Sequence, residues 1–500
     1  MTLYVIGIGG TGSKCLEAIT QLAAVGLFFQ EPIKLLFIDA DETNGNLERS
    51  RSSLSIYQRN FNLMSGDKQQ YAWLRTPLES YNVWSPFGNT SANKNLGAFF
   101  NYNNLKQKSP PLGNLFDVLY SKEEREANLD IGFRGRPAIG SGVMSRIDLD
   151  SLNEEPWSSI IGQIQADTGG GKSVKVFLCG SIFGGTGASG LPTIARLLDN
   201  KLRKENVREN VKIACLFLLP YFGFTPKAGE NKNEVYARSE QFLLNTEGAL
   251  RYYVNQAEQF DTVYLLGNQN LSQFNFSIGK NTQRNATHFV EFYAALAARH
   301  FSSYSPKQQE KVVLISRENN NSITWGDLPE QELVRAELVN ATRFVYVWLG
   351  NIAPELADAR KMGVRRFQDA APWFSKFFSA GGGGFFGNRD LPDFNQASQQ
   401  EAIESITGWC QNYLNWILDI HRCGGDDIKL FNYSVLAKLD GQLRGEELSD
   451  LVVGDNRDKG SKARDTVQNL KARLLDGNNF TAPNQGTTGL AKALYILCRL

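Results

Sequence analysis

The sequence predicts an α/β protein with a doubly wound, mostly parallel sheet, followed by a divergent, mainly helical C-terminal region. Short apolar runs alternate with helical patterns through the first three hundred residues. Two glycine-rich loops each follow such a run and open a helix. Strand, loop and helix in this order build parallel sheets whose ligand sites lie at the carboxyl ends of the strands. We therefore expect one α/β domain over residues 1–305 and a second region over residues 306–500.

The composition limits the classes of function. The 500 residues hold 53 Lys and Arg against 52 Asp and Glu, a formal net charge of +1. This balance excludes the basic surface of a dedicated nucleic-acid or anionic-membrane binder. No apolar stretch approaches the roughly 18 residues of a membrane span. The start, MTLYVIGIGG, lacks the basic region of a signal peptide. We expect a cytoplasmic protein with no membrane span and no nucleic-acid partner.

Cysteine and histidine usage indicates no zinc site. The six cysteines are scattered without a CxxC pair, and Cys15, Cys179 and Cys215 fall in apolar runs, where small buried thiols are common. The three histidines do not pair with one another or with a cysteine at metal-ligand spacing. His288 falls on an expected helix, and we interpret it as a satisfied buried histidine rather than a catalytic base.

The elements follow from periodicity and turn residues. The polar stretch 43–130 is expected to hold long connections with one or two helices, one near residues 116–126. The loop at 455–465 is expected to be solvated, and a glycine-rich loop covers 380–387. Strands are expected at residues 3–8, 33–38, 174–179, 211–219, 262–266, 312–316 and 322–325. Helices are expected at residues 13–25, 191–203, 234–257, 286–301, 330–349 and 396–420.

The first glycine loop, residues 7–12, has the pattern G-x-G-x-x-G between a strand and a helix. Glycines let the backbone approach phosphate oxygens, and the helix N-terminus supplies unpaired N–H donors. Asp39 ends the second strand, where an acid that binds ribose would lie. This loop alone favours a dinucleotide-binding domain, as in an NAD-dependent oxidoreductase.

The second glycine loop, residues 181–190, changes that interpretation. It again links a strand to a helix and adds the hydroxyls of Ser181, Thr186 and Ser189 to its backbone donors. Two such loops on one sheet favour a nucleoside triphosphate held from both sides. A third run, residues 166–173, is close to a Walker A motif, but it begins with Ala166 and precedes a strand, so we interpret it as a solvent loop.

Several motifs resemble those of one family. Residues 184–190, GGTGASG, resemble the signature loop of tubulin and its relative FtsZ, and residues 7–13, GIGGTGS, resemble the first phosphate loop. Asp-Ala-Asp at 39–41, GRPAIG at 135–140 and FDTVYLLGN at 260–268 resemble further family segments in the same order. The sequence is therefore similar to the tubulin/FtsZ superfamily over about residues 1–305.

The resemblance implies GTP or GDP and Mg²⁺ as cofactors, and a site for them. Asp41 would lie near the γ-phosphate and hold the metal through water, and Asn285 would hydrogen-bond guanine. Glu234 and Arg238 would contact the ribose, or instead form a solvated i,i+4 ion pair. The implied nucleotide-binding residues are Gly9, Gly10, Thr11, Gly12, Asp39, Asp41, Gly135, Arg136, Ser181, Gly184, Gly185, Thr186, Gly187, Glu234, Arg238 and Asn285.

The sequence departs from the family in its catalytic loop. Relatives carry an acidic Gly-x-x-Asn-x-Asp motif after the central helix, and it acts in the neighbouring subunit's nucleotide site. No such motif follows residue 305, and the nearest acid is Asp327. We expect Asp327 to be either the catalytic acid or an N-cap or first-turn acid of the next helix. Whether the protein is an enzyme stays open.

Three functions remain. The first is a GTP-binding protein that assembles head to tail, with GTP hydrolysis at the subunit contact. The second is a nucleotide-sensing scaffold that does not polymerise and docks other proteins through its C-terminal region. The third is an NAD oxidoreductase, which only the first loop and Asp39 favour. Phenylalanines near the 380–387 loop form either core or a partner patch: Phe374, Phe377, Phe378, Phe385 and Phe386.

Overall fold

The computed structural model describes most of the chain. The described residues are 1–28, 31–64, 73–88, 94–148, 150–224, 237–254, 260–275, 280–304, 311–316, 322–379, 391–423, 426–437, 448–475 and 486–500.

A seven-stranded sheet forms the centre of the described structure, and every neighbouring pair of strands is parallel. The strand order is β3-β2-β1-β4-β5-β7-β9, so the chain winds outward in one direction from β1 and in the other from β4. The point where the winding reverses lies between β1 and β4. The strands are β1 (Thr2–Ile8), β2 (Ile33–Ile38), β3 (Leu78–Ser80), β4 (Val174–Ser181), β5 (Val211–Leu218), β7 (Thr262–Leu266) and β9 (Val312–Ile315).

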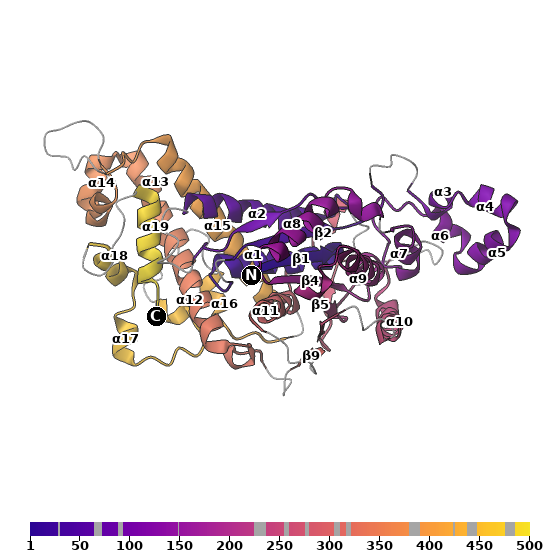
Figure 1. Ribbon diagram of the computed structural model, residues 1–500. Helices are drawn as coiled ribbons and strands as arrows, with labels where there is room; N and C mark the ends of the chain where they lie inside the picture. The colour runs from indigo at the N-terminus through magenta and orange to yellow at the C-terminus, as the bar shows by residue number, and fades with distance from the viewer. Residues whose placement is uncertain are drawn as a thin grey trace.

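Helices cover both faces of this sheet (Figure 1). All residues of β1, β2 and β4 are buried, and these strands are mostly apolar, with the buried Lys34 and Lys175 as charged exceptions. The doubly wound α/β prediction is confirmed. One face packs against α1 (Gly9–Ala24), α2 (Gly45–Leu63) and α11 (Phe289–Ser303). The other packs against α7 (Pro137–Met144), α8 (Trp157–Gly169) and α9 (Gly185–Lys204).

The C-terminal region is mainly helical, as expected, and it shares the core of the face that carries α1. Helix α15 packs against α2, and Asn60 on α2 donates a side-chain hydrogen bond to the Ser405 carbonyl at 3.1 Å. Phe374, Phe377 and Phe378 are buried core, whereas Phe385, Phe386 and the 380–387 loop lie outside the described residues. The helices are α12 (Gln331–Val347), α13 (Ala353–Met362), α14 (Val364–Ala370), α15 (Ala397–Arg422), α16 (Tyr433–Leu436), α17 (Lys459–Ala463), α18 (Val467–Leu475) and α19 (Gly486–Leu497).

Residues 43–130 contain more helix than the sequence indicated. Helix α2 has 19 residues, and small polar side chains such as Ser50, Ser53 and Asn60 share its buried face with Leu54 and Tyr57. This mixture hides the apolar stripe that would identify a buried helix. The single helix expected at 116–126 is wrong, because Tyr120 and Ser121 separate two helices there.

Two expectations beyond residue 305 need correction. The expected strand at 322–325 is only a bridge from Ile323 to Ile428, although the expected strand at 312–316 forms β9 at the sheet edge. The segment expected to be a solvated loop at 455–465 is mostly exposed, but it contains the short helix α17 (Lys459–Ala463) and an ion network. Asp465 accepts two hydrogen bonds from the guanidinium of Arg343, each at 2.5 Å, and one from Arg457 at 2.6 Å.

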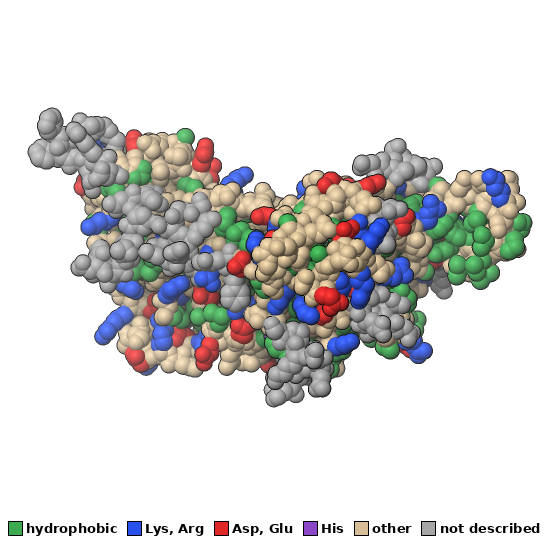
Figure 2. All heavy atoms as spheres, viewed as in Figure 1, with side chains coloured by type: hydrophobic (Ala, Val, Ile, Leu, Met, Phe, Trp, Pro, Cys, Tyr) green, Lys and Arg blue, Asp and Glu red, His purple; other side chains and the backbone are tan. Residues whose placement is uncertain are grey.

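A helical arm projects from the sheet at the end opposite the C-terminal helices (Figure 1). Its α5 exposes four apolar side chains, and Val118 among them is 83% exposed. Figure 2 shows hydrophobic side chains gathered at this end of the molecule. The four are Leu112, Leu115, Val118 and Leu119. The arm consists of α3 (Leu96–Phe99), α4 (Tyr102–Lys108), α5 (Pro110–Leu119) and α6 (Lys122–Glu126).

Within the described ranges, no helix combines the length and the apolar character needed to cross a membrane.

Candidate functional site

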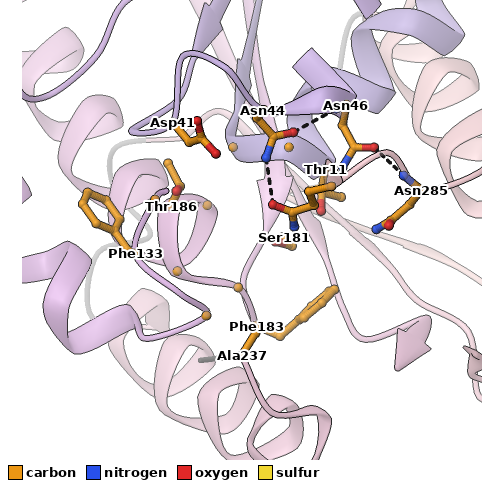
Figure 3. Close-up of a pocket in the computed structure, with 18 of the residues that line it drawn as sticks. Thr11, Asp41, Asn44, Asn46, Phe133, Ser181, Phe183, Thr186, Ala237 and Asn285 are labelled. Carbon is orange, nitrogen blue, oxygen red and sulfur yellow. Dashed lines mark hydrogen bonds between the residues drawn. The ribbon is translucent and has the colours of Figure 1, made fainter. Parts of the chain in front are cut away.

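A cavity opens at the carboxyl ends of β1 and β4, where the winding of the sheet reverses. Ligands of open α/β sheets bind at this position. Figure 3 shows Asp41, Thr186 and Phe133 on one side of the cavity and Asn46 and Asn285 on the other. The residues expected from sequence that line it are Gly9, Gly10, Thr11, Asp39, Asp41, Gly135, Ser181, Gly184, Gly185, Thr186, Gly187 and Asn285.

The first glycine loop turns directly into α1. Gly9 has a φ of +75°, which favours glycine, and a Cβ there would lie 3.2 Å from Cβ of Thr186 in the second loop. The two glycine loops therefore lie directly against each other where they line the cavity. Gly12 is a packing residue instead: its Cβ would lie 2.8 Å from the carbonyl oxygen of Cys179, so only glycine lets α1 approach β4 this closely.

The second glycine loop turns directly into α9. A Cβ at Gly187 would lie 2.3 Å from the carbonyl oxygen of Ser181, and one at Gly185 would lie 2.8 Å from Cβ of Phe133. These contacts leave no room for a larger residue. The loop is therefore held close to the backbone of β4.

Neither helix has a side-chain cap at its N-terminus. Ile8 and Gly184 occupy the N-cap positions of α1 and α9, no side chain accepts a hydrogen bond there, and neither first turn holds an acid. The first N–H groups of a helix have no intrahelical acceptor, and the helix dipole places partial positive charge on them. Two such N-termini at one cavity form a site for an anion with several charged oxygens.

Two acids from the loop after β2 line the same cavity. Asp39 is 2% exposed; its Oδ1 accepts the Asp41 N–H at 3.1 Å, and its Oδ2 has no hydrogen-bond partner among the described residues. Burial raises the pKa of Asp39 to about 7. Asp41 accepts from the Thr43 hydroxyl at 2.8 Å and from the Lys280 N–H at 2.7 Å.

These acids fit a magnesium ion held mainly by phosphates. Mg²⁺ in proteins keeps several waters and binds through one or two carboxylates together with substrate phosphates. Asp39 and Asp41 supply two carboxylates beside the two uncapped helices. Among the residues that the structure describes, no group of three or more His, Cys, Asp or Glu side chains forms an all-protein metal site.

The opposite part of the cavity is aromatic and amide-rich, and the sequence analysis missed most of it. Asn44 donates to the Gln283 side chain at 2.8 Å, and the Asn285 N–H donates to the side chain of Asn46 at 2.9 Å. The polar run directly after Asp41 was a signal for the two asparagines. Aromatic residues line both sides, since Phe133 lies on the side of Asp41 and Thr186, and they come from four segments: Phe133, Phe183, Tyr221, Phe222, Phe224 and Phe242.

Several expected site residues do not line the cavity. Gly12 packs α1 against the sheet, as above. Arg136 precedes α7 and lies 4.0 Å from Glu124 on the arm. Arg238 follows Ala237, which does line the cavity, and Glu234 lies outside the described residues.

Asp327 lies outside the cavity of its own chain. It ends a short 3-10 helix, Trp325–Asp327, and its Oδ2 accepts the Thr324 N–H at 2.7 Å and the Thr324 hydroxyl at 2.9 Å. This arrangement is a capping box. The carboxylate therefore already stabilises its own turn.

His288 is a satisfied buried histidine, as expected. It caps the N-terminus of α11, where its Nδ1 accepts the Val290 N–H at 3.1 Å. Its Nε2 lies 2.9 Å from the Ser272 hydroxyl. Burial lowers the pKa of His288 to about 3, so the ring is neutral.

The Walker-like run at 166–173 lies away from the cavity. Asp167 pairs with Lys172 at 3.2 Å and accepts the Tyr4 hydroxyl at 2.9 Å. The Ser173 carbonyl accepts the N–H of Thr2, at the amino end of β1. The run therefore lies at the amino edge of the sheet, and it ends α8 rather than opening a helix.

Residues 150–327 match the family model described as tubulin like. This part of the chain is similar to that family. The match begins before β4 and includes the second glycine loop, Asn285 and α11. No curated protein matches the chain.

Solved structures with detectable similarity to this chain include two CetZ proteins and a TubZ protein. CetZ from Methanosaeta thermophila has 14% identity and a TM-score of 0.27, over 68% of this chain and 59% of that one. CetZ1 from Haloferax volcanii, a GDP-bound monomer, has 11% identity and a TM-score of 0.28, over 62% of each chain. TubZ from Clostridium botulinum phage c-st has 11% identity and a TM-score of 0.24, over 59% and 58%. The chain thus spans about three fifths of the length of these structures.

Proposed function

We propose that this chain binds one guanine nucleotide with Mg²⁺ in the cavity between β1 and β4, and that it assembles head to tail. One observation carries the nucleotide proposal: the uncapped N-termini of α1 and α9 meet at one cavity. A dinucleotide fold needs one such loop for its pyrophosphate. Two loops on adjacent strands fit the longer run of charged oxygens in a triphosphate.

The cavity residues divide into two groups with different tasks. The N–H groups of the two first turns and the hydroxyls of Ser181 and Thr186 would bind the phosphates. Asp39 and Asp41 would hold Mg²⁺, which neutralises phosphate charge when bound. Phe183 and Asn285 would hold the base on the other side. The tubulin-like match over 150–327 supports guanine as that base.

The arm supports self-assembly. It leaves the sheet beside the loop at 131–135, which lines the cavity, and it exposes Leu112, Leu115, Val118 and Leu119. Monomeric proteins rarely expose contiguous large apolar side chains, and such patches mark interaction surfaces. A second copy seated on the cavity end would meet this patch. Because head-to-tail contacts are heterologous, repetition produces a filament.

We propose that any GTP hydrolysis waits for this contact. Within one chain, Asp327 lies outside the cavity and caps its own turn. Asp327 is the acid that a neighbouring copy would supply in this proposal. Asp327→Ala should then lower GTP turnover without changing GTP affinity, whereas the exposed neighbour Glu332→Ala should change neither. Equal turnover in both variants would remove Asp327 from the mechanism.

Two measurements test the proposal as a whole. Calorimetry of the full chain with Mg-GTP should show binding, and NAD should not bind. Light scattering and negative-stain microscopy with GTP and with a non-hydrolysable analogue should show assemblies. Binding without assemblies at high protein concentration would favour the nucleotide-sensing scaffold, and NAD binding would favour the oxidoreductase.

A further inference from the structure

A buried lysine lies in the wall of the cavity. Lys14, in the second turn of α1, is 2% exposed, and its Nζ forms an ion pair with the carboxylate of Glu291 on α11. Glu291 is fully buried. Taking two such charges out of water is expensive, so a buried ion pair is weak evidence for stability alone. The position of Lys14 against the cavity indicates a task for its charge.

The carboxylate of Glu291 is fixed from three directions. Its Oε1 accepts the Tyr221 hydroxyl at 2.7 Å, and its Oε2 accepts the His288 N–H at 2.9 Å in the capping box of α11. Its partner Lys14 is therefore held in one place. An ammonium has three N–H donors, and Nζ has no acceptor in hydrogen-bonding geometry among the described residues. Donors remain for a ligand in the cavity.

The ammonium lies on the base side of the cavity rather than the phosphate side. The proposed phosphate donors belong to the first turn of α1, and Lys14 is one turn further along the helix. It packs near the ring of Phe274, with Nζ 5.5 Å from the centroid, and against Tyr221 through Glu291. Tyr221 lines the same cavity, whereas Asp41 and Thr186 lie on the side of the cavity opposite Asn285 (Figure 3). Since Glu291 neutralises its charge, Lys14 supplies a strong donor rather than a net charge.

We propose that Lys14 determines base specificity by donating a hydrogen bond to the carbonyl oxygen at C6 of the purine. This inference rests on the proposed nucleotide function and assigns a residue to its selectivity. Adenine carries an amino group at the same position, which would place N–H donors against the ammonium and leave it without an acceptor. A site built to hydrogen-bond one group strongly rejects the analogue that lacks it. Asn285 would then hydrogen-bond another edge of the same base.

Three nucleotides separate this role from a structural one. GTP and ITP both carry the C6 carbonyl, ITP lacks the 2-amino group, and ATP lacks the carbonyl. A hydrogen bond to a charged group contributes about 1.5–3 kcal/mol, which corresponds to roughly a 10- to 150-fold change in affinity. Lys14→Met should weaken GTP and ITP binding by that factor without weakening ATP binding. Calorimetry of the full chain measures all three dissociation constants.

Controls keep the result interpretable. Lys108→Met, at an exposed lysine of the arm, should leave every affinity unchanged. Lys14→Met combined with Glu291→Gln removes the whole buried pair, so no unpaired charge remains if the single variant folds poorly. Both Lys14 variants should show the same collapse of the ATP-to-GTP ratio of dissociation constants.

Two results would overturn the assignment. An unchanged ratio in a folded Lys14 variant, or an equal loss of GTP, ITP and ATP, would mean that the ion pair only joins α1 to α11. If the unmodified chain binds none of the three nucleotides, the proposed function itself fails, and the assignment fails with it.

Discussion

Replacing Thr186 with aspartate should stabilise the nucleotide-free protein against unfolding and abolish nucleotide binding. Thr186 is the second residue of α9, it is half-buried, and it lines the cavity beside Gly9. Aspartate is similar in size but places a carboxylate against the N-terminus of a helix that has no acid in its first turn. Such a charge stabilises a helix by about 0.3–1 kcal/mol. The free energy of unfolding without nucleotide should therefore rise by about that amount.

The same carboxylate should repel the phosphates. Two like unit charges about 4 Å apart repel by roughly 4 kcal/mol at an effective dielectric constant of about 20. A triphosphate carries several charges, so this value is a lower bound. Each 1.4 kcal/mol is about tenfold in affinity, so Thr186→Asp should lose at least about a thousandfold. Thr186→Asn, which has similar size without the charge, should lose only about tenfold through its hydroxyl.

Calorimetry with Mg-GTP measures the affinity loss, and urea denaturation without nucleotide measures stability. Raising the salt concentration should narrow the gap between the aspartate and asparagine variants, because salt screens accessible charges. Equal GTP affinities for Thr186→Asp and Thr186→Asn would show that α9 does not bind phosphate. A lower stability of the aspartate variant would contradict the uncapped-helix argument.

Further predictions concern three other parts of the structure. The pKa of His288 is lowered to about 3 in the folded state, from 6.5 in the unfolded chain. Between these two pH values only the unfolded state binds a proton at His288, so stability is lost as the pH falls from about 6.5 toward 3. Between pH 7 and pH 5, His288 should account for a loss of about 2 kcal/mol in the free energy of unfolding. In urea denaturation, His288→Asn, which can still cap α11, should remove this loss. An unchanged pH dependence in the variant would contradict the prediction. The double variant Leu115→Asp, Val118→Asp should leave GTP affinity unchanged and reduce light scattering with GTP at least about tenfold. Unchanged scattering would show that the arm has no role in assembly. Gly187→Ala should lose GTP binding and about 1–3 kcal/mol of stability, because its Cβ meets the Ser181 carbonyl oxygen, and a variant with unchanged affinity would refute the tight second loop.

The sequence predicted the central strands and the two glycine loops for a physical reason. Strands buried on both faces are rich in apolar residues, so β1, β2 and β4 were evident despite Lys34 and Lys175. The glycines at 9 and 187 are required by a positive φ and by a close backbone contact, both local to their loops. Because these requirements act within one short segment, the residues of that segment are enough to predict them.

The remainder depended on contacts between distant segments. Helix α2 was hidden because Ser53 and Asn60 on its buried face hydrogen-bond to other elements instead of packing as an apolar stripe. Gln283 joins the site only because Asn44 meets it across 239 residues. In the sequence, Lys14 is indistinguishable from an ordinary helix residue, because its partner Glu291 lies on α11, far along the chain. Such side-chain pairs join distant segments, so no local sequence pattern predicts them.

The most direct test of the central claim is a calorimetric titration of nucleotide-free full-length chain with Mg-GTP, with NAD in a parallel titration. Because the two glycine loops share one cavity, the account predicts one GTP per chain and no binding of NAD. Two independent GTP sites, an absence of GTP binding, or binding of NAD in its place would contradict it.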